Sequence, residues 1–334
     1  MSPLTRGGWA RLLKTGPAVA AVVAATTAST IQPVIARDFP DPAVLAVGSI
    51  YYAYSTASSY GNKVWHVPVQ RASALDGKWT EVGDAMPQLP AWVAKNGANN
   101  GNVWAPEVAA RSDGSYILYF TARSAAQNVQ CIGVALASSP KGPFQAPGPG
   151  PLVCRPEEVD SIDPSAFTDS NGKQYLLYTS GKGKATIWLQ QVSVDGITPI
   201  GDRRALIQAD RPEEGNIVEA PAMVRHGGNY VLFYSGNAFN SGKYFVNYAT
   251  ADSLTKPFSK HAGQLLNRDT LGGGYNNPGG EEVVPGRKHD YLLFHAYTGP
   301  TQRSMFVASL SWDGDGNPTL DLKSLAKAPV KTKP

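Results

Sequence analysis

The chain has 334 residues, of which 42% are hydrophobic and 17% charged, and its formal net charge is +4. The first 36 residues contain three basic side chains, Arg6, Arg11 and Lys14, and no acidic one, so the charge of the remainder is +1 (4 − 3). A balance this small gives no reason to expect a nucleic-acid partner. No apolar run is long enough to span a membrane, so we expect no membrane partner.

The N-terminus has the layout of a secretory signal peptide. The basic residues precede a short apolar run, AVAAVVAA (18–25), and small residues follow it up to VIA at 34–36. We therefore predict that residues 1–36 are a signal peptide and that the protein is secreted and extracellular. The mature chain would begin near Arg37, or earlier if cleavage follows Ala28. An ordinary disordered tail is the alternative.

A tyrosine-led apolar motif recurs five times along the rest of the chain. Its copies, YYAYSTA, YILYFTA, YLLYTSG, YVLFYSG and YLLFHAY, begin at Tyr51, Tyr116, Tyr175, Tyr230 and Tyr291. Each copy follows a turn signal and a short run rich in Val, Ala and Ile, which is typical of a β-hairpin. A repeat of roughly 60 residues accommodates a four-stranded blade. We expect an all-β fold, a five-bladed β-propeller over residues 37–322.

An acidic residue precedes each hairpin at nearly the same register. These residues lie 9 to 12 positions before the repeat tyrosine and are Asp41, Glu107, Asp163, Glu219 and the pair Glu281 and Glu282. Glu219 lies inside an apolar run, where a charge is costly unless it is paired or neutralised. Five blades around one axis would bring these acids to one central opening, so the pattern predicts a functional site.

Several stretches resemble glycoside hydrolase family 43, a family of five-bladed propeller glycosidases. The similarity covers about residues 37–322 and rests on RDFPDPAVLAVGSIYYAYST, VWAPEV, SIDPSAFTDSNGKQYLLYTS, VEAPAMVRHGGNYVLFYSG and LLFHAY. The resemblance implies that Asp41 is the general base, that Asp163 tunes pKa and orientation, and that Glu219 is the general acid of an inverting reaction. A lone Asp-Pro is a common turn, whereas the order and spacing of the three acids are specific.

Three further residues have weaker assignments. Trp104 is either a stacking platform for a sugar face or a core residue. Arg303 resembles an arginine that contacts the bound sugar, and a surface ion pair is the alternative. His295 matches the position where arabinan-cleaving relatives hold a hydrated calcium, or it is structural. We expect no required cofactor beyond this one possible Ca²⁺. The stretch PGGEEVV (278–284) departs from relatives that carry Gly-His there.

The resemblance favours an enzyme that cleaves α-L-arabinofuranosyl linkages in plant cell-wall polysaccharide, either arabinan or arabinoxylan. The alternatives are a β-1,4-xylosidase of the same family and a sugar-binding propeller without catalysis. We expect a monomer whose partner is the polysaccharide or oligosaccharide substrate.

Two cysteines and a basic tail complete the sequence. Cys131 and Cys154 could form one disulfide in an oxidising compartment, or they are buried free thiols. Residues 323–334 are lysine-rich and are expected to be a solvated C-terminal tail.

Overall fold

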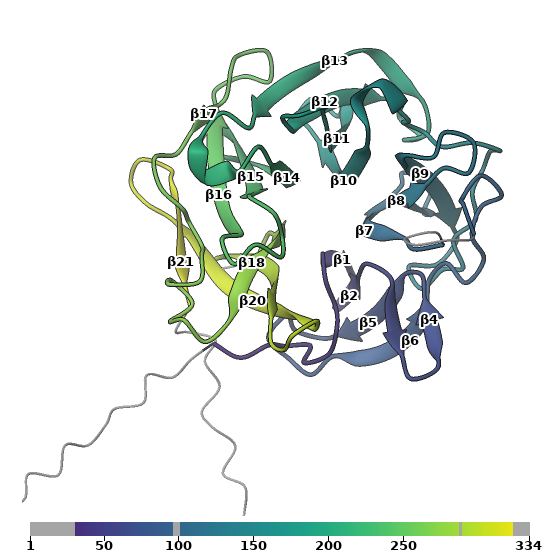
Figure 1. Cartoon of the computed structure of the whole chain (residues 1–334), viewed down its shortest axis with the longest axis horizontal. Helices are drawn as coiled ribbons and strands as arrows, with labels where there is room; N and C mark the ends of the chain where they lie inside the picture. Colours follow the sequence, from purple (N-terminus) through teal and green to yellow (C-terminus); the bar gives the residue numbers. More distant parts are fainter. Residues whose placement is uncertain (1–30, 96–100, 287–288, 323–334) are drawn as a thin grey trace, which may run out of the picture.

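The computed structural model describes residues 31–95, 101–286 and 289–322. Five antiparallel sheets are arranged around one axis as the blades of a propeller, which confirms the predicted fold (Figure 1). Within these ranges the only helices are two short 3-10 turns, Pro156–Glu158 and Pro212–Glu214, and none has the length and apolarity needed to cross a membrane. The predicted C-terminal tail and residues 1–30 of the predicted signal peptide lie outside the described residues.

The strands follow the chain order from blade to blade. The first blade contains β1 (Ala43–Val47), β2 (Ile50–Tyr54), β5 (Pro68–Ala72) and β6 (Thr80–Asp84), with the small hairpin β3 (Ser58–Tyr60) and β4 (Lys63–Trp65) inserted after β2. The second blade contains β7 (Trp104–Ala110), β8 (Tyr116–Arg123) and β9 (Gln130–Ala137). The third contains β10 (Ser161–Thr168), β11 (Gln174–Ser180), β12 (Thr186–Val192) and β13 (Pro199–Gln208).

The last two blades follow the same plan. The fourth contains β14 (Val218–His226), β15 (Asn229–Gly236), β16 (Phe245–Ala251) and the two-residue β17 (Ser259–Lys260). The fifth contains β18 (Asn276–Val284), β19 (Asp290–Tyr297), β20 (Arg303–Trp312) and β21 (Pro318–Asp321). The tyrosine-led motif forms the second strand of every blade, as the repeat predicted.

The second blade departs from the expected four strands. Three strands form its sheet, and at its outer edge β9 makes only isolated bridges, from Ile132 to Val153 and from Leu136 to Gln145. The intervening APGPGPL (146–152) has three prolines, which lack the N–H that a strand ladder needs. A disulfide between Cys131 and Cys154, with Cα atoms 4.6 Å apart, joins β9 to the returning chain. Of the two alternatives left open by the sequence, the structure has the disulfide.

The hydrophobic core lies between neighbouring blades. Five clusters of buried side chains fill the five interfaces between consecutive blades. Phe233 of β15 and Phe294 of β19, for example, belong to the cluster between the fourth and fifth blades. The second strand of each blade is buried on both faces for this reason, and its motif is therefore a continuous apolar run rather than an alternating one.

The N-terminal segment closes the propeller against the fifth blade. Ile31 and Ile35 are 4% and 3% exposed, and the backbone N–H of Val34 donates to the carbonyl of Met305. Cleavage near Arg37 would remove these packed residues, and the domain boundary at residue 37 stays a prediction. Cleavage after Ala28 would leave the segment in place, and it stays a prediction.

Every blade begins with the same backbone conformation. A residue in the left-handed region, with φ between 41° and 54°, precedes a proline near the axis, and these residues are Asp41, Ala105, Asp163, Ala220 and Asn277. The acids are placed around this X-Pro step at different offsets. Asp41 and Asp163 occupy the step itself, Glu219 lies one residue before it and Glu107 two residues after it. The acids are therefore in nearly the same register, as the sequence indicated, and of those four Asp41 and Asp163 occupy the same position of the step.

A ring of hydrogen bonds connects the blades near the axis. In each bond a backbone N–H at the start of one blade donates to a side chain of the preceding blade. The pairs are Ala105 to Thr56, Asp163 to Thr121, Ala220 to Asp163, Gly280 to Ser235 and Asp41 to His295. Hydroxyls accept three of these bonds. Asp163 and His295 accept the other two, so both residues also help to hold neighbouring blades in register.

Candidate active site

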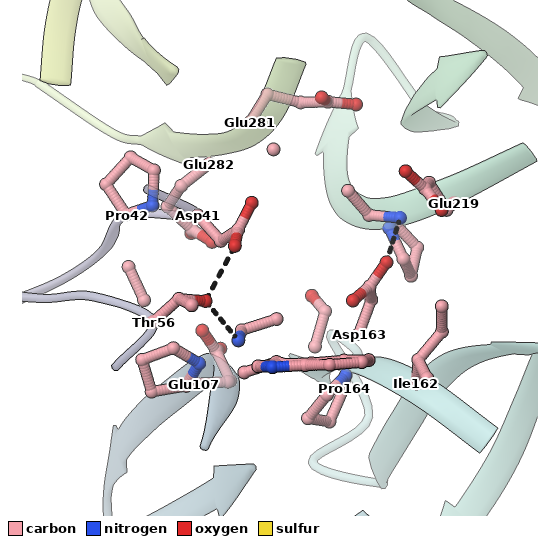
Figure 2. A pocket seen from close by; sticks show the side chains of 18 of the residues that line it. Asp41, Pro42, Thr56, Glu107, Ile162, Asp163, Pro164, Glu219, Glu281 and Glu282 are labelled. Atoms are coloured by element: carbon pink, nitrogen blue, oxygen red, sulfur yellow. Dashed lines mark hydrogen bonds between the residues drawn. The ribbon is translucent and has the colours of Figure 1, made fainter. Parts of the chain in front are cut away.

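The innermost strands of all five blades line a cavity of about 350 Å³ on the propeller axis. Every blade contributes at least one acid, and these are Asp41, Glu107, Asp163, Glu219 and the pair Glu281 and Glu282. Figure 2 shows the Asp41 carboxylate on one side of the cavity, facing Asp163 and Glu219 on the other. The predicted convergence of the acids is therefore confirmed.

Asp41 is held as a carboxylate by the groups around it. The Thr56 hydroxyl donates to Oδ2 at 2.6 Å, and Nη1 of Arg303 lies 3.4 Å from Oδ1. Burial alone would raise the pKa of Asp41, but the Arg303 guanidinium, the adjacent His295 side chain and the Thr56 hydroxyl together outweigh it and hold this pKa well below its ordinary value. Asp41 is therefore ionised at neutral pH and can accept a proton.

His295 supports Asp41 through a hydrogen bond to its backbone. Its ring is fully buried, and burial lowers its pKa, so the ring is neutral. The backbone N–H of Asp41, which can only donate, lies 3.1 Å from Nδ1. Nδ1 is therefore the acceptor, and Nε2, which carries the ring proton, has no hydrogen-bond partner among the described residues.

The structure leaves the calcium assignment at His295 a prediction. Within residues 31–95, 101–286 and 289–322, no group of three or more His, Cys, Asp or Glu side chains is placed to hold a metal. Calcium takes oxygen ligands, so an ion beside His295 would be bound mainly through water, whose oxygen would accept the free Nε2–H. The buried unpaired Nε2 fits a hydrated ion rather than a directly ligated one.

Asp163 and Glu219 have the opposite electrostatic setting. Burial and the charge of Asp41 raise the pKa of Asp163 to about 7, although the Ala220 N–H, 3.1 Å from Oδ2, favours its charged form. Burial and the neighbouring Asp163 raise the pKa of Glu219 to about 8. The hydroxyl of Tyr244 donates to Oε1 of Glu219 at 2.8 Å. Glu219 therefore keeps its proton at neutral pH and can donate it.

The remaining acids on the axis, Glu107, Glu281 and Glu282, also have raised pKa values. Burial raises the pKa of Glu107 to about 8, and Oε1 of this residue accepts the N–H of Ala166. Burial raises the pKa of Glu281 and of Glu282 well above the ordinary value. Glu281 is 5% exposed and accepts a hydrogen bond from Ser235. In this cavity only Asp41 has both a strongly lowered pKa and a cationic partner.

The two predicted sugar contacts both line the cavity. Trp104 is the first residue of β7 and is partly buried, and its stacking role stays a prediction. Arg303, with 17% of its side chain exposed, forms an ion pair with Asp41 inside the cavity, so the alternative of a surface ion pair is wrong. Its guanidinium also lies 5.1 Å from the ring centroid of Phe239, which is 42% exposed at the cavity wall.

Sequence reasoning missed Thr56, Phe239 and Tyr244. Thr56 had a signal, because a hydroxyl recurs five residues after the repeat tyrosine in four copies, at Thr56, Thr121, Ser180 and Ser235. Phe239 and Tyr244 lie in the loop between β15 and β16, outside the repeat motif. Nothing in their spacing distinguishes them from core aromatic residues.

Comparison with known proteins agrees with this geometry. The sequence model of the family described as "Glycosyl hydrolases family 43" matches residues 30–318. The chain is 27% identical over 277 residues to "Extracellular endo-alpha-(1->5)-L-arabinanase 1" of Bacillus subtilis (strain 168), covering 77% of this chain and 79% of the relative. It is 24% identical over 319 residues to "Extracellular exo-alpha-(1->5)-L-arabinofuranosidase ArbA" of Cellvibrio japonicus (strain Ueda107), covering 86% and 88%.

A solved structure gives the same result for the fold. The "Crystal structure of a thermostable family-43 glycoside hydrolase" superposes with a TM-score of 0.75 at 27% identity, covering 91% of this chain and 98% of that one. The family match and the superposition both span the five blades and the cavity that they enclose.

Proposed function

Because this chain belongs to glycosyl hydrolase family 43, we propose that it is a secreted, inverting glycosidase that cleaves α-L-arabinofuranosyl linkages in arabinan or arabinoxylan. The observation that carries the proposal is the pair of unlike carboxyl groups facing each other across the cavity. Asp41 has a pKa well below its ordinary value, whereas the pKa of Glu219 is raised to about 8. Glycosidic hydrolysis needs one group of each kind.

Asp41 acts in this proposal as the general base. A water molecule between Asp41 and the sugar gives a proton to the carboxylate while its oxygen bonds to the anomeric carbon. Arg303 and Thr56 keep Asp41 ionised, and the bond from its N–H to His295 fixes its backbone. The ionised carboxylate is therefore held ready in one orientation.

Glu219 acts as the general acid on the opposite side. Its proton passes to the glycosidic oxygen as the bond between that oxygen and the anomeric carbon breaks, so the leaving group departs as a neutral alcohol. Burial and the neighbouring Asp163 raise the pKa of this acid and keep it protonated at neutral pH. After product release, solvent removes the proton from Asp41 and returns one to Glu219.

The choice of an arabinoside follows the relatives, whose names describe an arabinanase and an arabinofuranosidase. The test measures hydrolysis of nitrophenyl α-L-arabinofuranoside beside the β-D-xyloside, with linear and debranched arabinan as polymers. We expect the arabinosides to be hydrolysed faster. Proton NMR of the first product should show the anomer opposite to that of the substrate, since inversion places water on the far face of the ring. Faster hydrolysis of the xyloside would replace the substrate part of the proposal.

Secretion rests on the basic and apolar layout of the N-terminus and on two relatives described as extracellular. Because Ile31 and Ile35 are packed in the fold, we place the cleavage before residue 31, after Ala28. Mass spectrometry of exported protein gives the N-terminus directly. An intact Met1 in exported protein would contradict the signal peptide.

A hydrated calcium ion beside His295 also belongs to the proposal. The free Nε2–H of this buried ring supports it, and a bound ion would supply positive charge near the axis. Metal analysis after dialysis against calcium should find about one ion per chain, and a chelator should lower the melting temperature as it removes the ion. Metal content that stays near zero would contradict this part.

A further inference from the structure

Tyr244 makes a direct contact with the proposed acid. The residue directly precedes β16, and only 3% of its surface is exposed. Its hydroxyl lies 2.8 Å from Oε1 of Glu219 and donates to it. Burial and the nearby Glu219 raise the pKa of Tyr244 well above its ordinary value, so the phenol stays protonated and remains a donor.

The surrounding residues hold the Tyr244 ring in place. A Cβ on Gly279 would lie 2.0 Å from Cε1 of the ring, so the ring packs directly on the glycine backbone. The ring of His295 is nearly parallel to it, with an interplanar angle of 16° and centroids 6.1 Å apart. The side chain of Asn277 accepts the backbone N–H of Tyr244. The hydroxyl therefore has a fixed direction.

This geometry assigns the two oxygens of Glu219 different tasks. Oε1 accepts the Tyr244 hydroxyl, so in the protonated acid the transferable proton belongs on Oε2. The same bond persists after proton transfer, when it stabilises the new carboxylate. A hydrogen bond to the charged form favours that form. Loss of the phenol hydroxyl should therefore make Glu219 a weaker acid.

We propose that Tyr244 is a positioning residue that fixes the proton of the general acid on Oε2 and stabilises the carboxylate left after transfer. The inference rests on the proposed role of Glu219, but it does not depend on which glycoside is cleaved. It also gives Gly279 a role, since any side chain at that position would displace the ring.

The charged and titratable groups around Glu219 come from several blades. The titratable and charged groups that face it are Asp163 on β10, Asp41 before β1, Arg303 on β20, Glu281 on β18 and Tyr244 itself. Replacing Tyr244 with phenylalanine removes one hydroxyl and leaves all the other groups in place. A change in the alkaline limb of the pH profile then reports the lost hydrogen bond.

The experiment compares the pH dependence of kcat/KM for the unaltered enzyme, Tyr244→Phe and Tyr234→Phe. Tyr234 is a matched control, because it is a fully buried tyrosine of the same blade whose hydroxyl donates to Glu214, which does not line the cavity. In Tyr244→Phe we expect the alkaline limb to move up by about one pH unit. In Tyr234→Phe the limb should stay in place even if stability falls. An unchanged or lowered limb in Tyr244→Phe would overturn the proposal.

Two further measurements keep the test decisive. Incorporating 3-fluorotyrosine at position 244 makes the phenol a better donor, so the limb should move down instead, and an upward shift would contradict the proposal. If no glycoside is hydrolysed, the proposed function fails, but the inference is still testable. The infrared carbonyl band that disappears in Glu219→Gln then gives the pKa of Glu219 directly, and this pKa should be higher in Tyr244→Phe.

Discussion

The two sides of the cavity share a backbone geometry but differ in electrostatics. Asp41 and Asp163 each precede a proline and each adopt a left-handed conformation, with φ of 50° and 54°. The pKa of Asp41 nevertheless lies well below its ordinary value, whereas that of Asp163 is raised to about 7. The local backbone therefore fixes where each carboxyl group lies, and the groups around that carboxyl decide its charge.

The partners explain the difference. Asp41 has the Arg303 guanidinium from the fifth blade and the Thr56 hydroxyl from its own blade. The Asp163 carboxyl group accepts the backbone N–H of Ala220 and faces the negative charge of Asp41, which raises its pKa more than Arg303 lowers it. Non-glycine residues in the left-handed region cost about 1 to 3 kcal/mol each, and such strain concentrates at functional sites. A fold that repeats this step five times can place five acids on one axis and tune each separately.

Removing the charge of Asp41 should have the largest effect. Asp41→Asn keeps the shape and the Thr56 contact but cannot accept a proton from water, so kcat should fall by about 10⁴, the upper end for general base catalysis. The loss should be similar for natural arabinan and for a nitrophenyl arabinoside, because both need activated water. Initial rates on the two substrates provide the measurement.

Asp84→Asn is the matched control for this change. Asp84 lies at the end of β6 in the same blade, accepts three backbone N–H groups and does not line the cavity. Its substitution should lower stability while sparing kcat. Near-normal activity in Asp41→Asn would show that another group is the base.

The general acid should show a dependence on the leaving group. Glu219→Gln removes the proton donor, so hydrolysis of arabinan should fall by about 10² to 10⁴. A nitrophenolate needs little protonation, so the nitrophenyl arabinoside should lose much less. Glu107→Gln, another raised-pKa carboxyl in the same cavity, should affect both substrates by one common factor. Equal losses in Glu219→Gln would mean that Glu219 is not the acid.

The sequence predicted the architecture because each blade contains one copy of the repeat. A motif at Tyr51, Tyr116, Tyr175, Tyr230 and Tyr291 fixes five hairpins, and the buried second strand of every blade requires the same apolar run. The second blade was mispredicted because its prolines fall between repeats, where the pattern places no constraint. The packing of Ile31 and Ile35 was also missed. The β-bridge from Ile35 to Met305 joins residues that are far apart in the sequence, so no local pattern indicates it.

The positions of the three acids and their assignment as base and acid came from the sequence, but most of the partners that set their charges did not. The resemblance supplied Asp41, Asp163 and Glu219, and all three line one cavity. Which carboxyl is ionised depends on contacts between residues far apart in sequence, such as Arg303 with Asp41 and Tyr244 with Glu219. Those contacts form when the five blades close into a ring, and the spacing of the residues along the chain does not indicate them.

Substitution of Arg303 tests whether the low pKa of Asp41, compared with Asp163 and Glu219, depends on the Arg303 guanidinium. Its charge lowers the pKa of Asp41, Asp163 and Glu219 alike, so Arg303→Gln should move both limbs of the pH profile to higher pH. The acid limb should move more, because Asp41 is the direct partner. Arg303→Lys retains the charge and should shift the limbs less. Limbs that stay in place in Arg303→Gln would assign the ionisation of Asp41 to other groups.

Asp163 gives the smallest effect, which is a change in pH dependence rather than in the chemical step. Asp163→Asn keeps an oxygen that can accept the Ala220 N–H but removes a negative charge that raises the pKa of Glu219. That pKa should fall, so Glu219 should lose its proton at a lower pH, and the alkaline limb of kcat/KM should move down by about one unit. Tyr244→Phe should move the same limb upward, and the double variant should lie between the two. If Asp163→Asn raised the limb or left it unchanged, the charge of Asp163 could not be what keeps the acid protonated.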